Sequence, residues 1–282
     1  MTDFTTTSNL PTPNKEKFRK RLMLPLSLFT VTVLTTTVVG GLAYSVSLIL
    51  ILLCHEMGHY LTARYYNVPA SLPYFLPSPL PPFGTFGAVI KMEGIIPDRK
   101  ALFDIGIMGP ALGLVVALPA AVIGISLSQV IPINDPSSIG LQLGDSIIFS
   151  FIVHLIHGPL PEGTDILLHP IGFAGWSGLL ITALNLLPLG QLDGGHIIYA
   201  LFFKKSSTIY WSIFLGLFCF AIIVDYRGWL FFLAFIYLMT RLRHPPTMED
   251  EKPIEMKRFI LGILAIIFLI VSFPPVPFMI AE

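Results

Sequence analysis

The sequence predicts an all-α membrane protein: a multi-spanning helical bundle of about seven spans, with one discontinuous helix and a short re-entrant segment like a β-hairpin. Three observations predict this class. Hydrophobic residues make up 54% of the 282 residues and charged residues only 12%, which is about half the charged fraction of a soluble domain. Several apolar runs are long enough to cross a bilayer as helices. Two stretches rich in proline and glycine interrupt these runs and exclude a regular helix there.

The overall charge and the cysteines narrow the classes of function. The formal net charge is zero, which excludes a general nucleic-acid-binding protein, because such proteins carry a basic surface. The two cysteines, Cys54 and Cys219, both lie in predicted spans. They do not indicate a disulfide framework, and we interpret both as packing residues. The expected surroundings are therefore a lipid bilayer, with no nucleic-acid partner.

Residues 1–21 are predicted to be a disordered, basic cytoplasmic tail. Residues 22–280 are predicted to form one membrane-embedded domain with its core motifs in 42–205. The first span is predicted at 22–39, directly after a run of Lys and Arg. A basic segment before an apolar one is also typical of a signal peptide. We favour a retained span, because the run is long and leads directly into the next one through a turn at Gly40 and Gly41.

The second predicted span, 42–63, contains His55-Glu56-Met57-Gly58-His59. Helix positions four apart share a face, so His55 and His59 can offer ring nitrogens to one metal ion. Glu56 lies one step round the helix, where its carboxylate can reach a water on that metal. Two histidines, a third protein ligand and one open position describe catalytic zinc. Ionisable groups inside a span are costly unless paired or metal-bound, so this cluster indicates a functional site.

Residues 69–99 form the first interruption, with six prolines between residues 69 and 82. Residues 85–92 have strand character. We interpret residues 71–92 as a re-entrant hairpin beside the helix of the metal motif. Non-helical backbone persists at membrane depth only where protein or a wet cavity surrounds it. An ordinary cytoplasmic connector fits the same sequence, and both interpretations stay open.

A third span is predicted at 101–127, where small residues such as Gly109 allow close helix packing. A long connection follows at 129–170 and includes His154 and His157, which lie three apart on one helical face. A second metal site is one hypothesis for this pair, and a surface helix or a cap over the cavity is the interpretation that we favour. His169 precedes Pro170 and is predicted to begin a helix. Further spans are predicted at 171–203, 208–224 and 228–240 and from residue 259 onward.

The apolar run 171–203 is too long for one span and is interrupted around Pro188 and Gly190. Pro188 removes a backbone donor and Gly190 loosens the next turn, so a discontinuous helix is predicted. An unpaired aspartate at this depth would be expensive, and metal ligation would neutralise it. Asp193 is therefore the candidate third ligand. His196 is a candidate to orient that carboxylate, or else a packed polar residue.

The positions of Lys and Arg indicate the orientation, because these residues favour cytoplasmic loops. With the basic tail inside, alternate loops contain every Lys and Arg except Arg227, and residues 101–203 contain none. This bias predicts seven spans with the N-terminus inside and the C-terminus outside. His55 and His59 then lie within the membrane, toward its cytoplasmic or stromal side.

Together these motifs resemble the site-2 protease family of intramembrane zinc metalloproteases, peptidase family M50. The resemblance rests on His55-Glu56-Met57-Gly58-His59 and on the motif that begins with Asn185 and Pro188 and ends in Leu192-Asp193-Gly194-Gly195. It covers about residues 42–246. Many members carry a PDZ domain in the loop that corresponds to 129–170, which is too short for one here, so the resemblance is to the branch that lacks it. Three further segments resemble the branch found in archaea, bacteria and chloroplasts: Gly109-Pro110, the Trp176 segment and Arg243-His244-Pro245-Pro246.

The resemblance implies one zinc ion per chain, held by His55, His59 and Asp193, with Glu56 activating water and Asn185 positioning the substrate backbone. It implies hydrolysis of peptide bonds in or near the transmembrane segments of single-span membrane proteins, as in regulated intramembrane proteolysis. A prior site-1 protease on the same substrate is a candidate partner. The membrane would be the cell membrane of a prokaryote or a chloroplast-type organelle membrane.

Two rival functions remain at this point. Broken helices at mid-membrane also form ion sites in transporters and channels, where these residues would carry zinc or relay protons. A catalytically inactive membrane scaffold of the same fold is the other rival. Glu56 discriminates best, because a pure zinc carrier needs no general base beside His55. The sequence identifies neither the substrate nor the signalling pathway, nor the oligomeric state.

Overall fold

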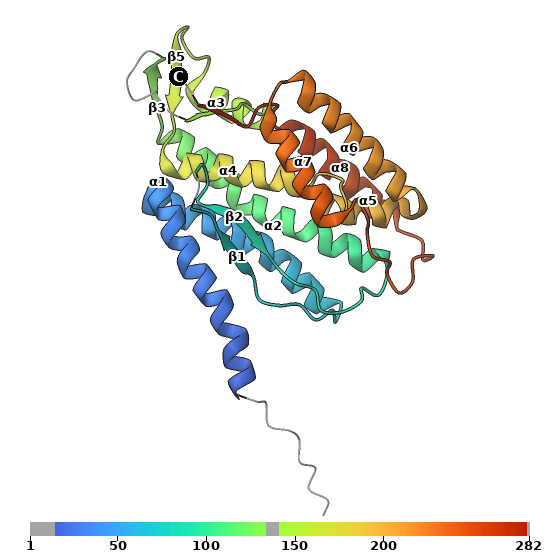
Figure 1. The fold of residues 1–282 in the computed structure, drawn as a ribbon. Coiled ribbons are helices and arrows are strands. Elements are labelled where there is room, and N and C mark those ends of the chain that lie inside the picture. The colour runs from blue at the N-terminus through green and yellow to red at the C-terminus, as the bar shows by residue number, and fades with distance from the viewer. Residues whose placement is uncertain (1–14, 80, 134–140, 281–282) are drawn as a thin grey trace, which may run out of the picture.

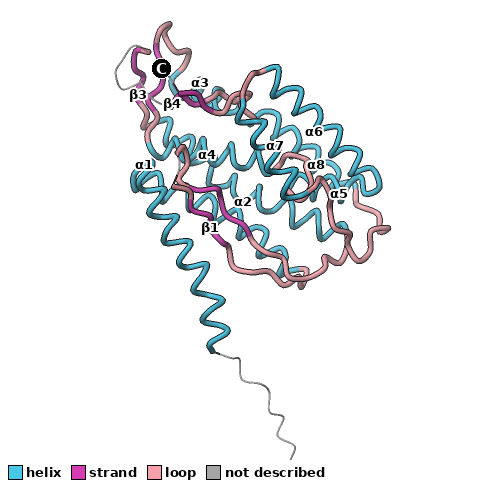
Figure 2. The backbone as a smooth tube through the Cα atoms, viewed as in Figure 1, coloured by secondary structure: helices cyan, strands magenta, loops and turns pink. Residues whose placement is uncertain are grey.

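The protein is mostly helical in the computed structural model, which describes residues 15–79, 81–133 and 141–280 (Figure 1, Figure 2). Three short antiparallel strand pairs join the helices, namely β1 with β2, β3 with β5, and β4 with β6. Of residues 1–21, which are predicted to be disordered, residues 1–14 lie outside the described part. Residues 15–21 are helical instead, because α1 begins at Lys15 and continues into the first apolar run. The helices are α1 Lys15–Tyr65, α2 Arg99–Ser126, α3 Ile147–His157, α4 Pro170–Asn185, α5 Asp193–Phe202, α6 Ser206–Ile223, α7 Arg227–Thr240 and α8 Met256–Ser272; the strands are β1 Tyr74–Pro77, β2 Thr85–Val89, β3 Gln129–Pro132, β4 Leu141–Leu143, β5 Thr164–Leu167 and β6 Phe278–Ile280.

Helix α1 consists of two arms that meet at Gly41, where φ is +79° and ψ is 176°. Glycine adopts this backbone conformation without the penalty that a Cβ atom imposes. The arms fold back on each other, since the hydroxyl oxygens of Thr36 and Ser45 lie 2.7 Å apart across the bend. Figure 1 shows the sharp change of direction. The turn predicted at Gly40 and Gly41 is therefore present.

Length and composition identify fewer membrane-crossing helices than the seven predicted spans, without deciding the count. Three helical segments are long and apolar enough to cross a membrane, Leu22–Tyr65, Arg99–Ser126 and Asp193–Ile223. The first contains both arms of α1 and so two of the predicted spans. Three other helices are shorter, with 16 residues in α4, 14 in α7 and 17 in α8. The chain is a membrane-type helical bundle, and the count of seven spans stays a prediction.

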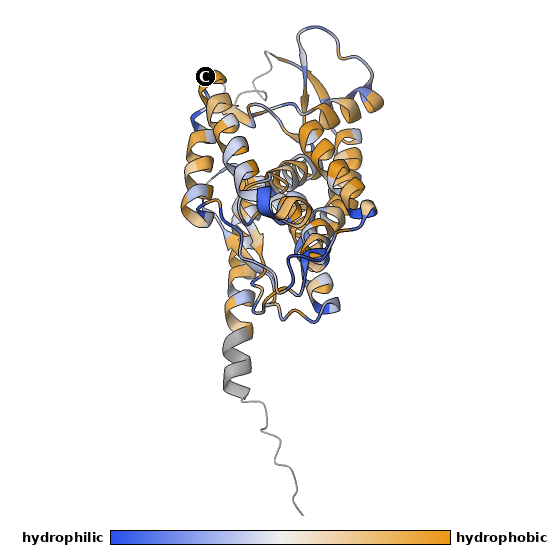
Figure 3. Ribbon diagram, turned by 90° about the vertical axis from the view of Figure 1, so that its right-hand side faces the viewer, coloured by the Kyte–Doolittle hydropathy of each residue, from blue (hydrophilic) through white to orange (hydrophobic). Residues whose placement is uncertain are grey.

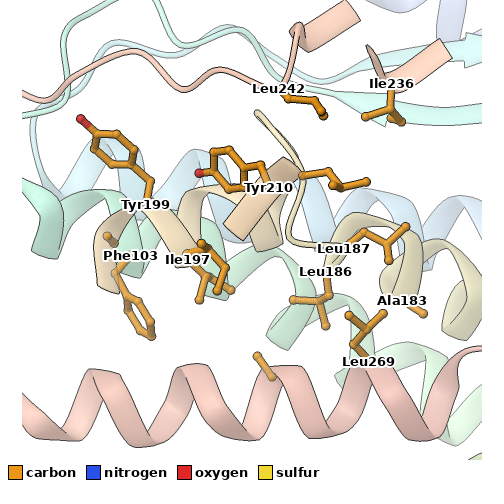
Figure 4. Close-up of a cluster of buried hydrophobic side chains, with 14 of the residues drawn as sticks. Phe103, Ala183, Leu186, Leu187, Ile197, Tyr199, Tyr210, Ile236, Leu242 and Leu269 are labelled. Atoms are coloured by element: carbon orange, nitrogen blue, oxygen red, sulfur yellow. The ribbon is translucent and has the colours of Figure 1, made fainter. Parts of the chain in front are cut away.

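The interruption predicted after Asn185 is present, because α4 ends at that residue and α5 begins at Asp193. Apolar side chains hold the intervening turn. Leu186, Leu187 and Leu189 are buried against Phe103 of α2 and against residues of α5, α7 and α8. Figure 4 shows this cluster, with Ile197 and Leu269 beside the two leucines that precede Pro188. This packing fixes the positions of Asn185 at the end of α4 and Asp193 at the start of α5.

Strands β1 and β2 pair where strand character is predicted. Both arms of α1 hold the turn between them. The Thr35 hydroxyl donates to the Gly84 carbonyl at 2.6 Å, and the Tyr44 hydroxyl donates to the Phe83 carbonyl at 3.1 Å. The strand pair thus lies against α1 (Figure 2), and its depth in a membrane stays a prediction.

The described part of the connection 129–170 contains β3, β4, α3 and β5 and no PDZ domain. Together with the start of α4 it surrounds a cavity of about 650 Å³. Trp176 of α4 fixes this end by donating its indole N–H to the Gly144 carbonyl at 3.0 Å. Many large apolar side chains of the helices are exposed, which is the polarity that a lipid-facing surface requires. Figure 3 shows that hydrophobic residues dominate the helices.

Candidate metal centre

Three side chains from two distant segments converge in the interior. His55 and His59 come from the second arm of α1, one helical turn apart, and Asp193 begins α5. One ligand atom from each lies within 4.8 Å of the other two. The two histidines are only 3% and 6% exposed, and the aspartate side chain is 13% exposed. Among the described residues this is the one group of three or more His, Cys, Asp or Glu side chains assembled for a metal ion.

The spacing of these atoms fits zinc. The Nε2 atoms of His55 and His59 are 3.2 Å apart. The Asp193 carboxylate lies 3.1 Å from the first and 3.2 Å from the second. Tetrahedral zinc with bonds of 2.0–2.1 Å requires ligand atoms about 3.3 Å apart. The Nδ1–H of His59 donates to the Ile105 carbonyl at 2.8 Å, which leaves its Nε2 with a free lone pair for a metal.

Helix α2 passes directly over the histidines because residue 109 has no side chain. A Cβ atom on Gly109 would lie 2.1 Å from the Nε2 atom of His59, which is far inside van der Waals contact. A Cβ atom on Gly58 of α1 would likewise lie 2.2 Å from the carbonyl oxygen of Met108. The absent side chain at position 109 therefore leaves the space in front of the ligand nitrogen that a metal ion requires.

Glu56 lies beside this group but is not part of it. Its side chain is buried, and its carboxylate accepts a hydrogen bond from the backbone N–H of Ile90, just after β2. Its charge acts on both His59 and Asp193. Because the two histidines and Asp193 already supply three protein ligands, the metal does not need the oxygens of Glu56. That carboxylate is therefore available for proton transfer.

Asn185 lies at the same centre, at the last position of α4. Its amide nitrogen is 3.2 Å from the Nε2 atom of His55. The broken helix thus presents an amide from one end and a carboxylate from the other to the same histidine. The side chain remains adjacent to the metal group, within reach of anything bound there.

His196 points away from the three ligands toward a residue that the sequence did not single out for the site. Its Nδ1 lies 2.6 Å from the Nε2 of His244, and the Nδ1 of His244 donates to the Pro245 carbonyl. A carbonyl only accepts, so His244 has a bare Nε2, and His196 must donate to it. Tyr199 stacks on the His244 ring. Burial lowers the pKa of His244 to about 4.

The sequence assigns His244 no role beyond its place in the segment Arg243-His244-Pro245-Pro246. No spacing rule relates residues 48 positions apart, so only the fold brings the pair together. The Arg-His-Pro-Pro segment that contains His244 was the one sequence feature that could have drawn attention to this residue.

The other histidines lie elsewhere. His157 donates its Nε2–H to the Ile125 carbonyl at 2.9 Å, and His154 lines the cavity beside α3. Among the described residues, no group of three or more metal ligands includes either one, so the structure does not assemble the hypothesised second metal site. His169 caps α4 by accepting from the Ile171 N–H, as predicted. Cys54 and Cys219 are free thiols.

Comparisons with known proteins are consistent with this geometry. The model of the family described as "Peptidase family M50" matches residues 43–223, which include every residue of the metal group. "Probable zinc metalloprotease EGY2, chloroplastic" of Oryza sativa subsp. indica is 29% identical over 230 residues, or 79% of this chain and 41% of the relative. "Probable zinc metalloprotease EGY1, chloroplastic" of Arabidopsis thaliana is 34% identical over 163 residues, or 57% of this chain and 29% of the relative.

The EGY2 protein of Arabidopsis thaliana, which carries the same description as its rice counterpart, is 28% identical over 242 residues. That match covers 84% of this chain and 42% of the relative. The chain therefore spans less than half the length of the curated relatives that it matches.

Proposed function

Because the chain belongs to peptidase family M50, we propose that it is an intramembrane zinc metalloprotease. It hydrolyses peptide bonds in or near the transmembrane segments of membrane proteins. One observation carries the proposal: His55, His59 and Asp193 offer ligand atoms within 4.8 Å of one another, with the separate carboxylate of Glu56 beside them. Three ligands and an uncommitted base are the parts of a hydrolytic metal site.

The three ligands would hold one zinc ion per chain. Zinc bound there would act as a Lewis acid that acidifies water and polarises a carbonyl group. The hydrogen bond from His59 to the Ile105 carbonyl keeps that ring in the tautomer and orientation that ligation needs. His196 and His244 brace the first turn of α5, which carries Asp193.

Glu56 performs the proton transfers. It accepts a proton from the attacking water and returns it to the nitrogen of the leaving amine, so that one carboxylate serves as base and then as acid. The surrounding apolar helices exclude bulk water, which keeps the transfer between these groups.

The substrate must be extended at the scissile bond, because the amides of a helix are closed by their own hydrogen bonds. Asn185 binds the substrate backbone beside His55. Strand β2 offers an edge for strand addition, and the Ile90 amide at its end contacts Glu56. A substrate strand on β2 would therefore bring its backbone to the catalytic carboxylate.

The arrangement in the membrane is part of the proposal. The chain has seven spans with its basic N-terminus inside, β1 and β2 re-enter the membrane, and the metal centre lies toward the cytoplasmic or stromal side. The substrate is a single-span protein, trimmed beforehand by a site-1 protease. The relatives described as chloroplastic favour an organelle membrane of that type, and the cell membrane of a prokaryote is the alternative location.

The test replaces Glu56 by Gln, which keeps the shape of the side chain and removes its ability to accept a proton. A general base contributes about 10²–10⁴ in rate, so E56Q should nearly abolish cleavage of a membrane-spanning substrate in liposomes. Zinc content, measured by elemental analysis, should stay near one per chain in E56Q. In His55→Ala, His59→Ala and Asp193→Ala it should fall.

The same vesicles separate the rival functions. A zinc-sensitive dye inside them reports transport, and electrophoresis reports cleavage. Equal cleavage by wild type and E56Q would remove Glu56 from the mechanism. Zinc flux without cleavage would indicate a transporter, and neither activity would indicate an inactive scaffold. Full zinc retention by all three ligand variants would refute the metal centre.

A further inference from the structure

A second polar cavity lies away from the metal centre, between the start of α6 and the end of α7. It has a volume of about 570 Å³. The two helices lie side by side (Figure 1). The cavity is lined by Ser207 and Trp211 from α6, by Tyr237 and Leu238 from α7, and by Arg241 and Arg243 from the segment after α7.

Arg241 and Arg243 are exposed cations without a carboxylate partner among the described residues. Their neighbours at this end of the molecule differ in that respect. Lys204 is paired with Glu251 at 3.3 Å, and Lys252 is paired with Glu249. Two unpaired guanidinium groups on one cavity create a site for an anion with several acceptor oxygens, because each group presents a planar fork of donors.

The backbone at Arg241 and Leu242, beside the cavity, has a costly conformation. Arg241 has a φ of +48° and Leu242 a φ of +51°, so two consecutive side-chain-bearing residues are left-handed, which L-residues avoid. Leu242 is fully buried in the core, while the arginines on either side are exposed. Strain of this kind persists only where the surroundings enforce it, and it concentrates at functional sites.

An apolar groove continues from this cavity along α6. A cavity of about 470 Å³ is lined by Trp211, Ser212, Phe214, Leu215 and Phe218, and it shares Trp211 with the polar one. From Ser207 to Phe218 the two cavities extend about 16 Å along the helix axis, at 1.5 Å per residue. Helix α6 belongs to the candidate span Asp193–Ile223, so this groove faces lipid.

Aromatic rings mark the boundary between the two compartments. The ring centroids of Trp211 and Tyr237 are 6.0 Å apart, and both side chains are partly exposed. Tryptophan and tyrosine favour the level of the lipid headgroups in a membrane. The polar cavity therefore lies at headgroup depth and the apolar groove at acyl-chain depth.

We propose that this groove binds one anionic phospholipid. Arg241 and Arg243 contact its phosphate, and an acyl chain lies along α6 between Trp211 and Phe218. The charge of the unpaired arginines selects an anion, and the apolar continuation selects a lipid over free phosphate or an acidic peptide. Basic pockets between membrane helices are known to bind anionic headgroups in this way. The inference does not depend on the protease function.

The test measures lipid binding to the protein in detergent by native mass spectrometry, with phosphatidylglycerol and phosphatidylcholine as probes. Phosphatidylglycerol should bind as a single molecule, at least tenfold more tightly than phosphatidylcholine. Arg241→Gln combined with Arg243→Gln should weaken it about thirtyfold, since each arginine near an anionic headgroup contributes roughly fivefold. Lys204→Gln combined with Lys205→Gln removes the same charge at the same end, outside the cavity. It should change binding less than threefold.

A second variant tests the groove, because Leu215→Ser on the exposed face of α6 leaves the core intact. This variant should bind phosphatidylglycerol more weakly than the wild type does. A roughly 10-fold excess of inorganic phosphate should not displace the lipid from the wild type. Circular dichroism and size exclusion would verify that each variant is folded. Four results would overturn the proposal: equal binding of the two lipids, equal losses in the arginine and lysine variants, no effect of Leu215→Ser, or displacement by phosphate alone.

Discussion

At the scale of single residues, the glycine at position 109 decides whether the metal group can exist. Replacing Gly109 by Ala would place a methyl carbon 2.1 Å from the Nε2 atom of His59. Alanine favours a helix by about 1 kcal/mol over glycine, so Gly109→Ala should stabilise α2 itself. Any loss of zinc would then come from the clash with His59.

We expect Gly109→Ala to reduce bound zinc from about one per chain to near zero while the helical content stays unchanged. Elemental analysis and circular dichroism measure the two quantities. Gly216→Ala is the matched control, because a Cβ atom at Gly216 meets nothing within 4 Å, and it should keep its zinc. Normal zinc content in Gly109→Ala would show that α2 does not close over the histidines.

His244 gives a pH dependence of stability. Burial lowers its pKa to about 4, from about 6.5 in an unfolded chain. Between pH 6.5 and 4 the unfolded state binds the proton and the folded state does not, so stability falls as the pH falls through this window. The groups that face His244 are His196, Tyr199 and Asp250. They remain in place in His244→Gln.

The melting temperature of His244→Gln should therefore decline less than that of the wild type between pH 7 and pH 4.5. Intrinsic fluorescence during heating measures both profiles. His154→Gln serves as the control, since that histidine is exposed, and it should follow the wild type. Parallel profiles of wild type and His244→Gln would contradict the assignment.

The two kinds of site residue differ in how far the sequence could predict them. His55, Glu56 and His59 follow from helical spacing, and Asp193 follows from the cost of an unpaired carboxylate in an apolar segment. Each argument needs only local sequence. The sequence predicts close helix packing at Gly109 but not that His59 is the residue it faces, and it does not predict the contact of His196 with His244. These contacts join segments far apart in the chain, and no periodicity records them.

At the scale of elements, the break between α4 and α5 brings chemistry to the centre of the bundle. A continuous helix would direct its polar residues around its axis, whereas the turn presents Asn185 and Asp193 to the same histidine. The sequence predicts this break because Pro188 cannot donate a hydrogen bond and Gly190 loosens the next turn. In the structure Gly190 has a left-handed φ of +54°. The sequence also predicts helix boundaries closely, since the span predicted at 228–240 corresponds to α7, Arg227–Thr240.

Helix α3 is the element that we expect to control substrate access. It borders the 650 Å³ cavity at the end of the bundle where residues 129–170 lie, and it is held by two buried side chains, Phe149 and Ile152. Truncating such side chains to alanine costs about 2–5 kcal/mol each. Phe149→Ala combined with Ile152→Ala should therefore loosen α3 without touching the metal ligands.

If α3 restricts access, this double variant should cleave substrates that have not been trimmed, while the wild type cleaves only trimmed ones. Electrophoresis of both substrates measures the ratio, and elemental analysis should find zinc unchanged. Leu155→Ala, at an exposed position of the same helix, should behave as the wild type. Unchanged selectivity in the double variant, or loss of zinc, would count against a gate.

At the scale of the whole molecule, the helix ends gather at two opposite poles. At one pole, Arg99 at the start of α2 donates to the carbonyls of Ala200 in α5 and Lys252 before α8. Arg258 of α8 also forms a two-pronged ion pair with Asp104 of α2 there. At the other pole, the amide of His169 before α4 donates to the hydroxyl of Ser128 after α2.

This arrangement agrees with the alternation that the cations predict, since the pole with Arg99 and Arg258 also holds the end of α5. The ion pair between Arg258 and Asp104 joins α8 to α2 at this end. The hydrogen bonds from the guanidinium to Asp104 hold the pKa of Arg258 well above its usual range. The number of spans and the side of the membrane on which each pole lies stay predictions.

Single cysteines in a background of Cys54→Ala and Cys219→Ala test that sidedness. Glu251→Cys lies at the pole of Arg99, and Glu162→Cys lies in the exposed turn before β5. Because Lys and Arg are retained on the cytoplasmic side, we expect an impermeant maleimide to label Glu162→Cys in right-side-out vesicles and Glu251→Cys only in inverted ones. Ser8→Cys in the basic tail should follow Glu251→Cys. Labelling of Glu162→Cys and Glu251→Cys from the same side would refute the alternation, and labelling of Ser8→Cys with Glu162→Cys would refute the first span. The reverse pattern for all three would place the metal centre toward the outer face and would require substrates to be cut from that side.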